Sequence, residues 1–415
     1  SLYINTIWIS PLVENAYGSW GEWKSPYSKF SSYHGYWPVS FTKLNPAFCS
    51  AEELHQLVDI VHSKEKNILL DVVANHIHKN HLFYKSNPEF FTDLYLPDGS
   101  MNTELWDEHR LTTWFDVFLP TMDLEKKPVY EMLSDSIFYW LNTYKIDGFR
   151  HDATKHIPAI FWKTLTKKIK QNYTSKNNEA VFQIGETYGS HDLVGSYVNS
   201  GQLNSQFDFN FYDAVMKVLC ENASWNTFVN VVNKSTEQYG DHHLMGNITG
   251  NQDKGRTISY LGGALKRNED AKIAGWTRNV GIGDEELAFK KMKIIHLLNS
   301  TLPGIPVLYY GDEIGIPGGN DPDCRRMMYF NNLNNNEKNL KKEVSRLLKL
   351  RSSSMPLLYG DLDWVEVENT KLIYSRSFGP SLVTVCINTS QKIESFNFEG
   401  YKFDLPSFAY KIINN

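Results

Sequence analysis

Short apolar runs that end in an acidic or amide residue recur along the chain, and they constrain its fold more than any other feature. Residues 68–73 form a continuous apolar run with one acid, typical of a parallel strand covered on both faces. A β-branched, aromatic run over residues 3–9 predicts an earlier buried strand. Between them, Ser50 and Glu53 match a capping box that begins an amphipathic helix. Strand, helix and strand in this order predict right-handed crossovers and an α/β sheet.

The same alternation resumes after a polar, aromatic excursion over residues 77–121 and continues almost to residue 353. The further predicted strands begin near residues 148, 181, 206, 245 and 303. The predicted helices cover residues 130–144, 160–169, 285–298 and 336–352. Beyond residue 355 the pattern changes to short alternating strands over 371–376 and 381–388, which predict a separate antiparallel module. We therefore predict a catalytic domain in two parts (1–76 and 122–353), an inserted subdomain (77–121) and a C-terminal β-sandwich domain (354–415).

Composition excludes several kinds of partner. A net charge of -5 argues against a nucleic acid or an anionic membrane surface, and no apolar run is long enough to span a membrane. The four cysteines lie far apart without a CxxC pair, so neither a zinc site nor a disulfide framework is indicated. Aromatic residues make up 14%, a share that suits either core packing or a carbohydrate-binding cleft.

Residues 148–156 carry the clearest chemical signal. They form a short strand that runs into a loop, and alternate side chains of a strand share a face, so Arg150 and Asp152 point to the same side. A guanidinium beside a carboxylate lowers the carboxylate's pKa and keeps it ionised. Such an anion at the edge of a parallel sheet suits covalent catalysis at a sugar carbon. A structural Arg–Asp pair is the alternative interpretation of this stretch.

Acids stand in or just after several of the predicted strands. A closed (β/α)₈ barrel would bring them to the rim where barrel enzymes keep their chemistry. Any one of them could instead cap a loop or pair with an arginine, but several at corresponding places favour a shared site. These acids are Asp71, Asp152, Glu186, Asp253 and Asp312.

Seven segments of the chain resemble the ordered sequence regions of the α-amylase family of retaining glycoside hydrolases, and they occur in the family's order. The matching segments are residues 33–37, 71–76, 148–156, 185–187, 251–253, 303–313 and 318–325. The resemblance spans nearly the whole chain. It implies a (β/α)₈ TIM barrel, a short excursion after the third strand and a C-terminal antiparallel β domain. Because the chain starts at what resembles the second barrel strand, we expect the first strand to be missing from these 415 residues.

The resemblance also implies roles for three acids. Asp152 is the nucleophile, Glu186 the general acid/base, and Asp253 the third carboxylate, which binds sugar hydroxyls. Nearby anions and partial burial should raise the pKa of Glu186 so that it can protonate the leaving oxygen. Retention predicts about 5–5.5 Å between the carboxyl groups of the nucleophile and the acid. The implied substrate-binding residues are His34, Tyr36, Trp37, His76, Arg150, Lys155, Gln252, Asp321 and Arg325. Among them, Tyr36 stacks on the sugar and Lys155 reaches the sugar on the leaving side.

Two positions depart from the family pattern. Gln252 stands where a histidine usually precedes the third acid; its amide still donates a hydrogen bond but cannot become cationic, so we expect altered affinity or specificity. Many members also bind a structural calcium. Asn75 and the carbonyl of His156 match two of its ligands, whereas Thr121 replaces the expected aspartate. With one anionic oxygen gone, a structural calcium is doubtful, and no cofactor is needed for the chemistry.

The leading hypothesis is hydrolysis of α-1,4-glucosidic bonds in starch, glycogen or maltooligosaccharides, so the expected partner is an oligosaccharide or polysaccharide. Transglycosylation or sucrose/trehalose-type chemistry on the same scaffold is the alternative, because a sugar can intercept the covalent intermediate. A third hypothesis, from a different class of function, is a catalytically inactive relative that binds glycans. For the compartment, we favour a periplasmic or secreted protein over a cytoplasmic one; the sequence says nothing of the oligomeric state.

Overall fold

A computed structural model describes residues 2–24, 27–398 and 400–414. The chain forms two compact units. The N-terminal unit is Ile4–Phe207, and the C-terminal unit contains the chain from Asp208 onward. Each unit has its own sheets and helices, and each is described below by itself.

A five-stranded parallel sheet organises the N-terminal unit, with the strand order β1-β4-β5-β6-β7. The strands are β1 (Thr6–Ile9), β4 (Asn67–Val72), β5 (Gly148–His151), β6 (Phe182–Gly185) and β7 (Ser205–Gln206). The first strand is shorter than the predicted 3–9, and its residues are only half-buried. The register pairs Asp71 with Arg150 and Arg150 with Ile184. Because the strands are parallel, the residues that follow them emerge at one edge of the sheet.

Helices connect these strands as the alternation predicted. They are α1 (Ala51–His62), α3 (Lys127–Tyr144), α4 (Ala159–Ile169), α5 (Ser175–Asn177) and α6 (His191–Ser196). The predicted capping box is confirmed, because the Ser50 side chain accepts from Glu53 N and the Glu53 carboxylate accepts from Ser50 N. The apolar faces of α1, α3 and α4 pack into one core with β4 and β5, which holds the strands in place.

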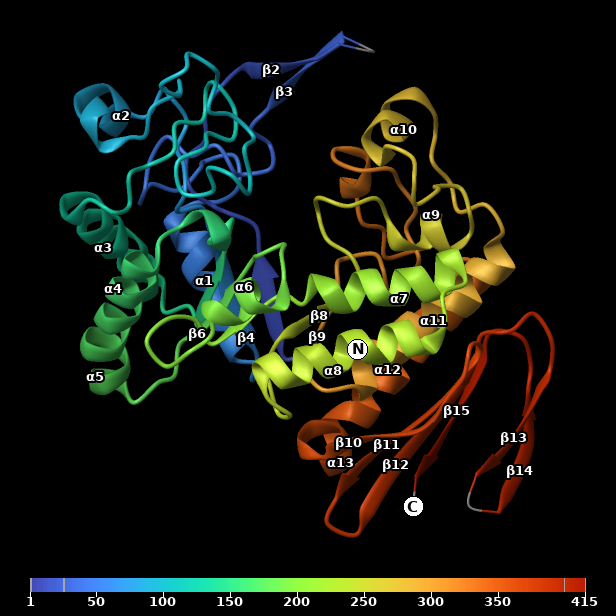
Figure 1. Cartoon of the computed structure of the whole chain (residues 1–415). Coiled ribbons are helices and arrows are strands. Elements are labelled where there is room, and N and C mark those ends of the chain that lie inside the picture. Colours follow the sequence, from blue (N-terminus) through green and yellow to red (C-terminus); the bar gives the residue numbers. More distant parts are fainter. Residues whose placement is uncertain (1, 25–26, 399, 415) are drawn as a thin grey trace. The chain divides into compact units, whose positions relative to one another are not determined.

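The excursion over residues 77–121 has little regular structure. It contains α2 (Leu82–Ser86), followed by a 3₁₀ turn at Pro88–Phe90 and several isolated bridges. Its Phe118 and Leu119 form a buried cluster with Trp37. A hairpin of β2 (Ser19–Lys24) and β3 (Tyr27–Ser31) precedes α1, in a stretch for which the sequence analysis predicted no strand (Figure 1).

The C-terminal unit begins with helices that the sequence did not predict. The predicted strand near residues 206–210 ends at Gln206, because the Asp208 carboxylate accepts from Phe211 N and caps a helix. Parallel β8 (Gly246–Ile248) and β9 (Ile305–Val307) form a second small sheet. The helices are α7 (Phe209–Glu221), α8 (Trp225–Tyr239), α9 (Thr257–Leu261), α10 (Ala271–Thr277), α11 (Glu285–Thr301), α12 (Asn335–Ser353) and α13 (Met355–Tyr359).

An antiparallel β module ends the chain, as predicted. Four strands pair in the order β10-β11-β12-β15, and β13 pairs with β14 (Figure 1). Their bounds are β10 (Asp361–Val367), β11 (Lys371–Phe378), β12 (Ser381–Asn388), β13 (Glu394–Phe398), β14 (Tyr401–Leu405) and β15 (Ala409–Asn414). Among the described residues, no helix combines the length and apolar character that crossing a membrane requires.

Candidate active site

One buried arginine joins three carboxylates at the edge of the N-terminal sheet. Arg150 Nη1 lies 2.9 Å from Asp71 Oδ1 and 2.8 Å from Asp152 Oδ1, and its Nη2 lies 2.6 Å from Glu186 Oε2. The arginine side chain is only 1% exposed. The planar guanidinium presents its donors in a fixed fork, so the three acids are held in a defined arrangement. Asp152 and Glu186, the predicted nucleophile and general acid/base, therefore bind the same guanidinium.

Asp71, one of the acids predicted for a shared site, lies here together with Trp8, which the sequence analysis did not single out. Asp71 Oδ2 accepts from the Trp8 indole N–H at 3.0 Å and from the Tyr36 hydroxyl at 2.8 Å. The Arg150 guanidinium also lies 5.0 Å from the centroid of the Trp8 ring, at cation–π distance. Asp71 thus fixes both the arginine and the tyrosine. The single charge inside an apolar strand was the available signal for Asp71.

The surroundings shift the pKa values of Glu186 and Arg150. Burial raises the pKa of Glu186 above its ordinary value; the Asp152 carboxylate raises it further, while Arg150 opposes both. This confirms the predicted direction for the pKa of Glu186. Although burial alone lowers the pKa of Arg150, the surrounding carboxylates raise it well above its usual range, so the guanidinium stays charged.

The predicted sugar-binding residues of the N-terminal unit surround Tyr36. His34 Nδ1 accepts from Tyr36 N at 3.0 Å, and its ring stacks 5.7 Å from the tyrosine ring. His76 Nε2 donates to the Tyr36 carbonyl at 3.1 Å, and burial lowers the pKa of this histidine to about 4. Trp37 is buried with its ring edge-on to Phe118. The neutral histidines and packed rings hold the tyrosine in a fixed place.

Lys155 lies in a 3₁₀ turn, Thr154–His156, directly after the nucleophile loop. Its ammonium lies 3.0 Å from Asp107 Oδ1. Its carbonyl accepts from Arg110 Nη1 at 2.6 Å, so the excursion contacts both ends of the residue. The structure therefore places Lys155 between the nucleophile loop and the excursion.

The remaining predicted residues lie in the C-terminal unit, around a second arginine. Arg325 Nη2 donates to Asp253 Oδ1 at 3.1 Å, and its Nε lies 2.6 Å from Asp321 Oδ1. Gln252 is buried, and its carbonyl accepts from the Cys324 thiol at 2.9 Å. The structure thus brings Asp253, Asp321 and Arg325 together. That all three catalytic acids surround one sugar ring, with about 5–5.5 Å between the nucleophile and the acid, stays a prediction.

Arg256, which the sequence analysis did not single out, binds main-chain groups of Tyr310 and Cys324. Its Nε donates to the Cys324 carbonyl at 2.7 Å, and its Nη1 donates to the Tyr310 carbonyl at 2.6 Å. Nη1 also pairs with the buried Asp312 at 3.2 Å. Burial raises the pKa of Asp312 to about 6 despite this arginine. One guanidinium thus links the loops that carry Gln252, Tyr310 and Cys324, which explains the acid predicted at position 312.

Thr121 stands at the position of the aspartate that the resemblance implies as a calcium ligand. Thr121 donates to the Thr113 carbonyl at 2.7 Å and accepts from Asn75 Nδ2 at 3.4 Å, so its hydroxyl is already bonded. Asn75 Oδ1 is buried without a partner among the described residues. His156 donates to the Arg110 carbonyl at 2.7 Å and so occupies another oxygen. The two predicted ligands, Asn75 Oδ1 and the carbonyl of His156, are both neutral, whereas calcium prefers six to eight oxygens with carboxylates among them.

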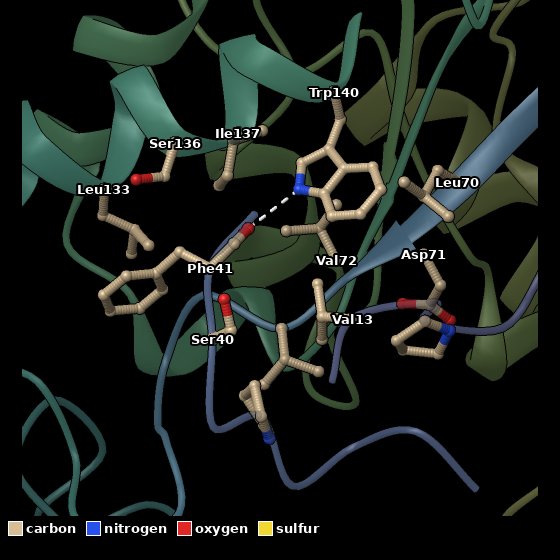
Figure 2. Close-up of a pocket in the computed structure, with 13 residues that line it drawn as sticks. Val13, Ser40, Phe41, Leu70, Asp71, Val72, Leu133, Ser136, Ile137 and Trp140 are labelled. Carbon is tan, nitrogen blue, oxygen red and sulfur yellow. Dashed lines mark hydrogen bonds between the residues drawn. The ribbon is translucent and has the colours of Figure 1, made fainter. Parts of the chain in front are cut away.

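A separate pocket lies between β4 and α3 (Figure 2). Its lining is mostly apolar, and Trp140 Nε1 donates across it to the Phe41 carbonyl at 2.8 Å. The carboxylate of Asp71, which also borders it, is already bonded to Trp8, Tyr36 and Arg150. A sugar site needs several polar groups that converge on the ligand, and this pocket offers few. We therefore assign it to core packing.

Comparisons with known proteins identify the family. The family model of the alpha-amylase catalytic domain matches residues 1–353. A cyclomaltodextrin glucanotransferase from Geobacillus stearothermophilus is 27% identical over 98% of this chain and 54% of its own length. A cyclomaltodextrinase from Geobacillus thermopakistaniensis is 26% identical over 90% of this chain and 60% of its own length. The chain thus spans little more than half the length of these relatives.

The solved structures show the same fold. An Anoxybacillus alpha-amylase matches all of this chain and 87% of its own, with a TM-score of 0.81 and 23% identity. The fold common to these proteins is a TIM barrel followed by an antiparallel β domain, and the C-terminal sheet described above agrees with it. Given the match over residues 1–353, the chain belongs to the alpha-amylase family of glycoside hydrolases.

Proposed function

We propose that the protein is a retaining α-glucoside hydrolase that acts on α-1,4-glucans or maltooligosaccharides. The observation that carries this proposal is the fork of Arg150, which binds Asp152 and Glu186 on different nitrogens. Because burial and the neighbouring anion raise the pKa of Glu186, this acid keeps its proton more readily than an ordinary glutamate. One carboxylate prepared to attack and one prepared to donate a proton are what double displacement requires.

In the first step, Glu186 protonates the glycosidic oxygen while the Asp152 carboxylate attacks the anomeric carbon. The bond to the leaving sugar breaks, and a glycosyl–aspartate ester forms. In the second step the Glu186 carboxylate takes a proton from water, whose oxygen attacks the same carbon and releases Asp152. Asp71 and Arg150 hold both acids in place but exchange no proton with the substrate.

The other predicted residues bind the substrate in this proposal. Tyr36, fixed by Asp71, offers its ring to the sugar at the cleavage site, and His34 and His76 keep that ring in place. In the C-terminal unit, Asp253 takes the role of the third carboxylate. The remaining sugar contacts are assigned to Trp37, Gln252, Asp321 and Arg325, and the leaving-side contact to Lys155.

Transfer to a second sugar is the second candidate function. In this reaction a sugar hydroxyl, instead of water, attacks the covalent intermediate. The name of the relative that matches 98% of this chain, a glucanotransferase, favours it. Sucrose- or trehalose-type transfer and an inactive glycan-binding role remain alternatives on the same scaffold.

One experiment tests the proposal directly. The protein is incubated with maltoheptaose, with and without a labelled acceptor sugar, and the products are separated by chromatography. Shorter maltooligosaccharides of α configuration support hydrolysis, whereas labelled longer products support transfer. An Asp152→Asn variant run in parallel should be inactive. Equal turnover by that variant, or no turnover of any α-glucan by the unaltered protein, contradicts the proposed mechanism.

We also propose that the protein works without calcium, because Thr121 occupies the position of the anionic ligand with a bonded hydroxyl. The domain boundaries at residues 76, 121 and 353 stay predictions. A periplasmic or secreted location likewise stays a proposal.

A further inference from the structure

The excursion segment 105–110 holds Lys155 at both of its ends. At the main chain, the Lys155 carbonyl accepts from Arg110 Nη1 at 2.6 Å and from the Tyr197 hydroxyl at 3.2 Å. At the side chain, the ammonium lies 3.0 Å from Asp107 Oδ1. Arg110 Nη1 also donates to the Tyr197 hydroxyl at 3.0 Å, which closes the arrangement. Lys155 is therefore fixed by groups from two separate parts of the chain, segment 105–110 and Tyr197.

Trp106 fixes the segment against the residue that follows Lys155. Its ring lies 5.6 Å from the His156 ring and 4.7 Å from the Phe115 ring, edge-on to both. Such aromatic contacts add stability beyond the area they bury. Since Trp106 precedes Asp107 directly, this packing sets where the Asp107 carboxylate stands relative to the lysine.

The two partners of the ion pair differ in exposure. The Lys155 side chain is 11% exposed, whereas that of Asp107 is 83% exposed. An ammonium has three donors, and Asp107 is the partner that the structure records for it within the described residues. The remaining donors can reach the hydroxyl groups of a sugar. Because Asp107 lies 3.0 Å away, it holds the ammonium in the place from which these donors reach the sugar.

We propose that Asp107 is a positioning residue of the acceptor-side sugar site. By holding the Lys155 ammonium in place, it sets how tightly an incoming sugar binds, and so which share of the covalent intermediate ends in transfer instead of hydrolysis. This inference rests on the proposed function. In the transfer step the bond between Asp152 and the anomeric carbon breaks, a bond forms from that carbon to the acceptor hydroxyl oxygen, and the hydroxyl proton passes to the Glu186 carboxylate.

The test uses α-maltosyl fluoride as donor, because fluoride leaves without touching a sugar site on the leaving side. Fluoride release measures formation of the covalent intermediate, and the longer product made with maltotriose measures transfer. Acceptor half-saturation is compared for the unaltered protein, Asp107→Asn, Lys155→Met and the double variant. Glu108→Gln, which removes the neighbouring exposed acid, is the matched control and should leave both readouts unchanged.

We expect Asp107→Asn to raise the acceptor half-saturation about two- to fivefold, the range for one exposed ion pair. In the Lys155→Met background the same change should have no further effect, because Asp107 acts through the lysine. Added salt should move the unaltered protein toward the Asp107→Asn value, since salt screens an exposed pair. A purely structural role for Asp107 would produce neither the coupling nor the salt dependence.

Other outcomes overturn the inference. An unchanged or lower half-saturation in Asp107→Asn does so, as does an equal effect of that change with and without Lys155. Release of hydrolysis products alone at saturating maltotriose also overturns it, while leaving the hydrolase proposal intact. If the unaltered protein releases no fluoride, or Asp152→Asn releases it equally fast, the proposed function itself fails, and this inference fails with it.

Discussion

Two arginines, one in each unit, bind the carboxylates of predicted site residues in different settings. Arg150, in the N-terminal unit, is 1% exposed and binds three acids. Arg325, in the C-terminal unit, binds Asp253 and Asp321, and the side chain of Asp253 is 52% exposed. A buried charge is stable only when it is paired and hydrogen-bonded, so the acids around Arg150 are fixed before any substrate arrives. An exposed pair contributes little, so Asp253 can exchange its arginine for a sugar hydroxyl at small cost.

The largest expected effect is a loss of turnover when one carboxylate bound by each arginine is replaced by its amide. Asp152→Asn removes the nucleophile, and turnover of maltoheptaose should fall about 10⁴-fold or more, because no covalent intermediate forms. Asp253→Asn removes only charge stabilisation, so we expect a fall of about 10²- to 10³-fold. Thermal unfolding of both variants is the control for folding. Equal losses in the two variants would contradict the assigned difference in roles.

The buried carboxylates around Arg150 also predict a pH dependence of the activity. Glu186 must be protonated to act on the leaving oxygen, so kcat/KM for maltoheptaose should fall as the pH rises through its pKa. Because burial raises that pKa, the fall should lie above the range of an ordinary glutamate. Glu186→Gln should abolish this alkaline limb and lower kcat about 10²- to 10⁴-fold. An alkaline limb that persists in Glu186→Gln assigns the titration to another group.

The sequence predicted the strands and the acids that follow them, because these are local patterns. It placed Asp71 among the acids of a shared site but did not give its partners, since Trp8 and Arg150 lie 63 and 79 residues away and no local pattern joins them. Only the parallel register places Asp71 beside Arg150. Arg256 was missed for the same reason, because its contacts at Tyr310 and Cys324 lie 54 and 68 residues further along the chain.

Two elements were mispredicted because their local pattern is misleading. Residues 207–211 alternate Phe, Asp, Phe, Asn and Phe, which has the period of a strand. The side chain of Asp208 nevertheless caps α7, so the helix begins at Phe209. The hairpin of β2 and β3 has an irregular register between Trp20 and Trp23, and such a break interrupts the alternation by which a strand is recognised.

Acid should weaken the N-terminal unit through its buried histidines, and His81 offers a clean test. Its Nδ1 accepts from Phe83 N at 3.0 Å, and burial lowers its pKa to about 4. The unfolded chain takes up the proton near pH 6.5, so stability is complete above that pH and falls as the pH drops toward 4. One such histidine lowers the free energy of unfolding by at most about 1.4 kcal/mol for each pH unit of acidification. His76, His78 and His156 are lowered in the same direction.

His81→Asn keeps an acceptor at the start of α2 and removes the titrating ring. Between pH 7 and 5, the free energy of unfolding of this variant should fall by about 2 kcal/mol less than that of the unaltered protein. Urea unfolding at the two pH values measures the difference. His109→Asn, at a histidine that lies in the same excursion but is not buried, is the control and should follow the unaltered protein. A parallel fall in all three proteins would remove His81 from the explanation.

The smallest expected effect is that of metal removal. Chelation with EDTA should change neither Tm nor kcat/KM, because the Thr121 hydroxyl bonds to the Thr113 carbonyl where the family has a carboxylate ligand. Thr121→Asp restores an anionic oxygen beside Asn75, whose buried Oδ1 has no partner among the described residues. This variant should be less stable without metal, since an unpaired carboxylate is then buried. Calcium should stabilise it by about 2.7 kcal/mol at 100 times its Kd, and the unaltered protein not at all. The prediction is contradicted if the Tm of the unaltered protein falls in EDTA and recovers with calcium. Neutral oxygens would then suffice to hold the ion, and the hydrogen bonds of Thr121 would not replace it.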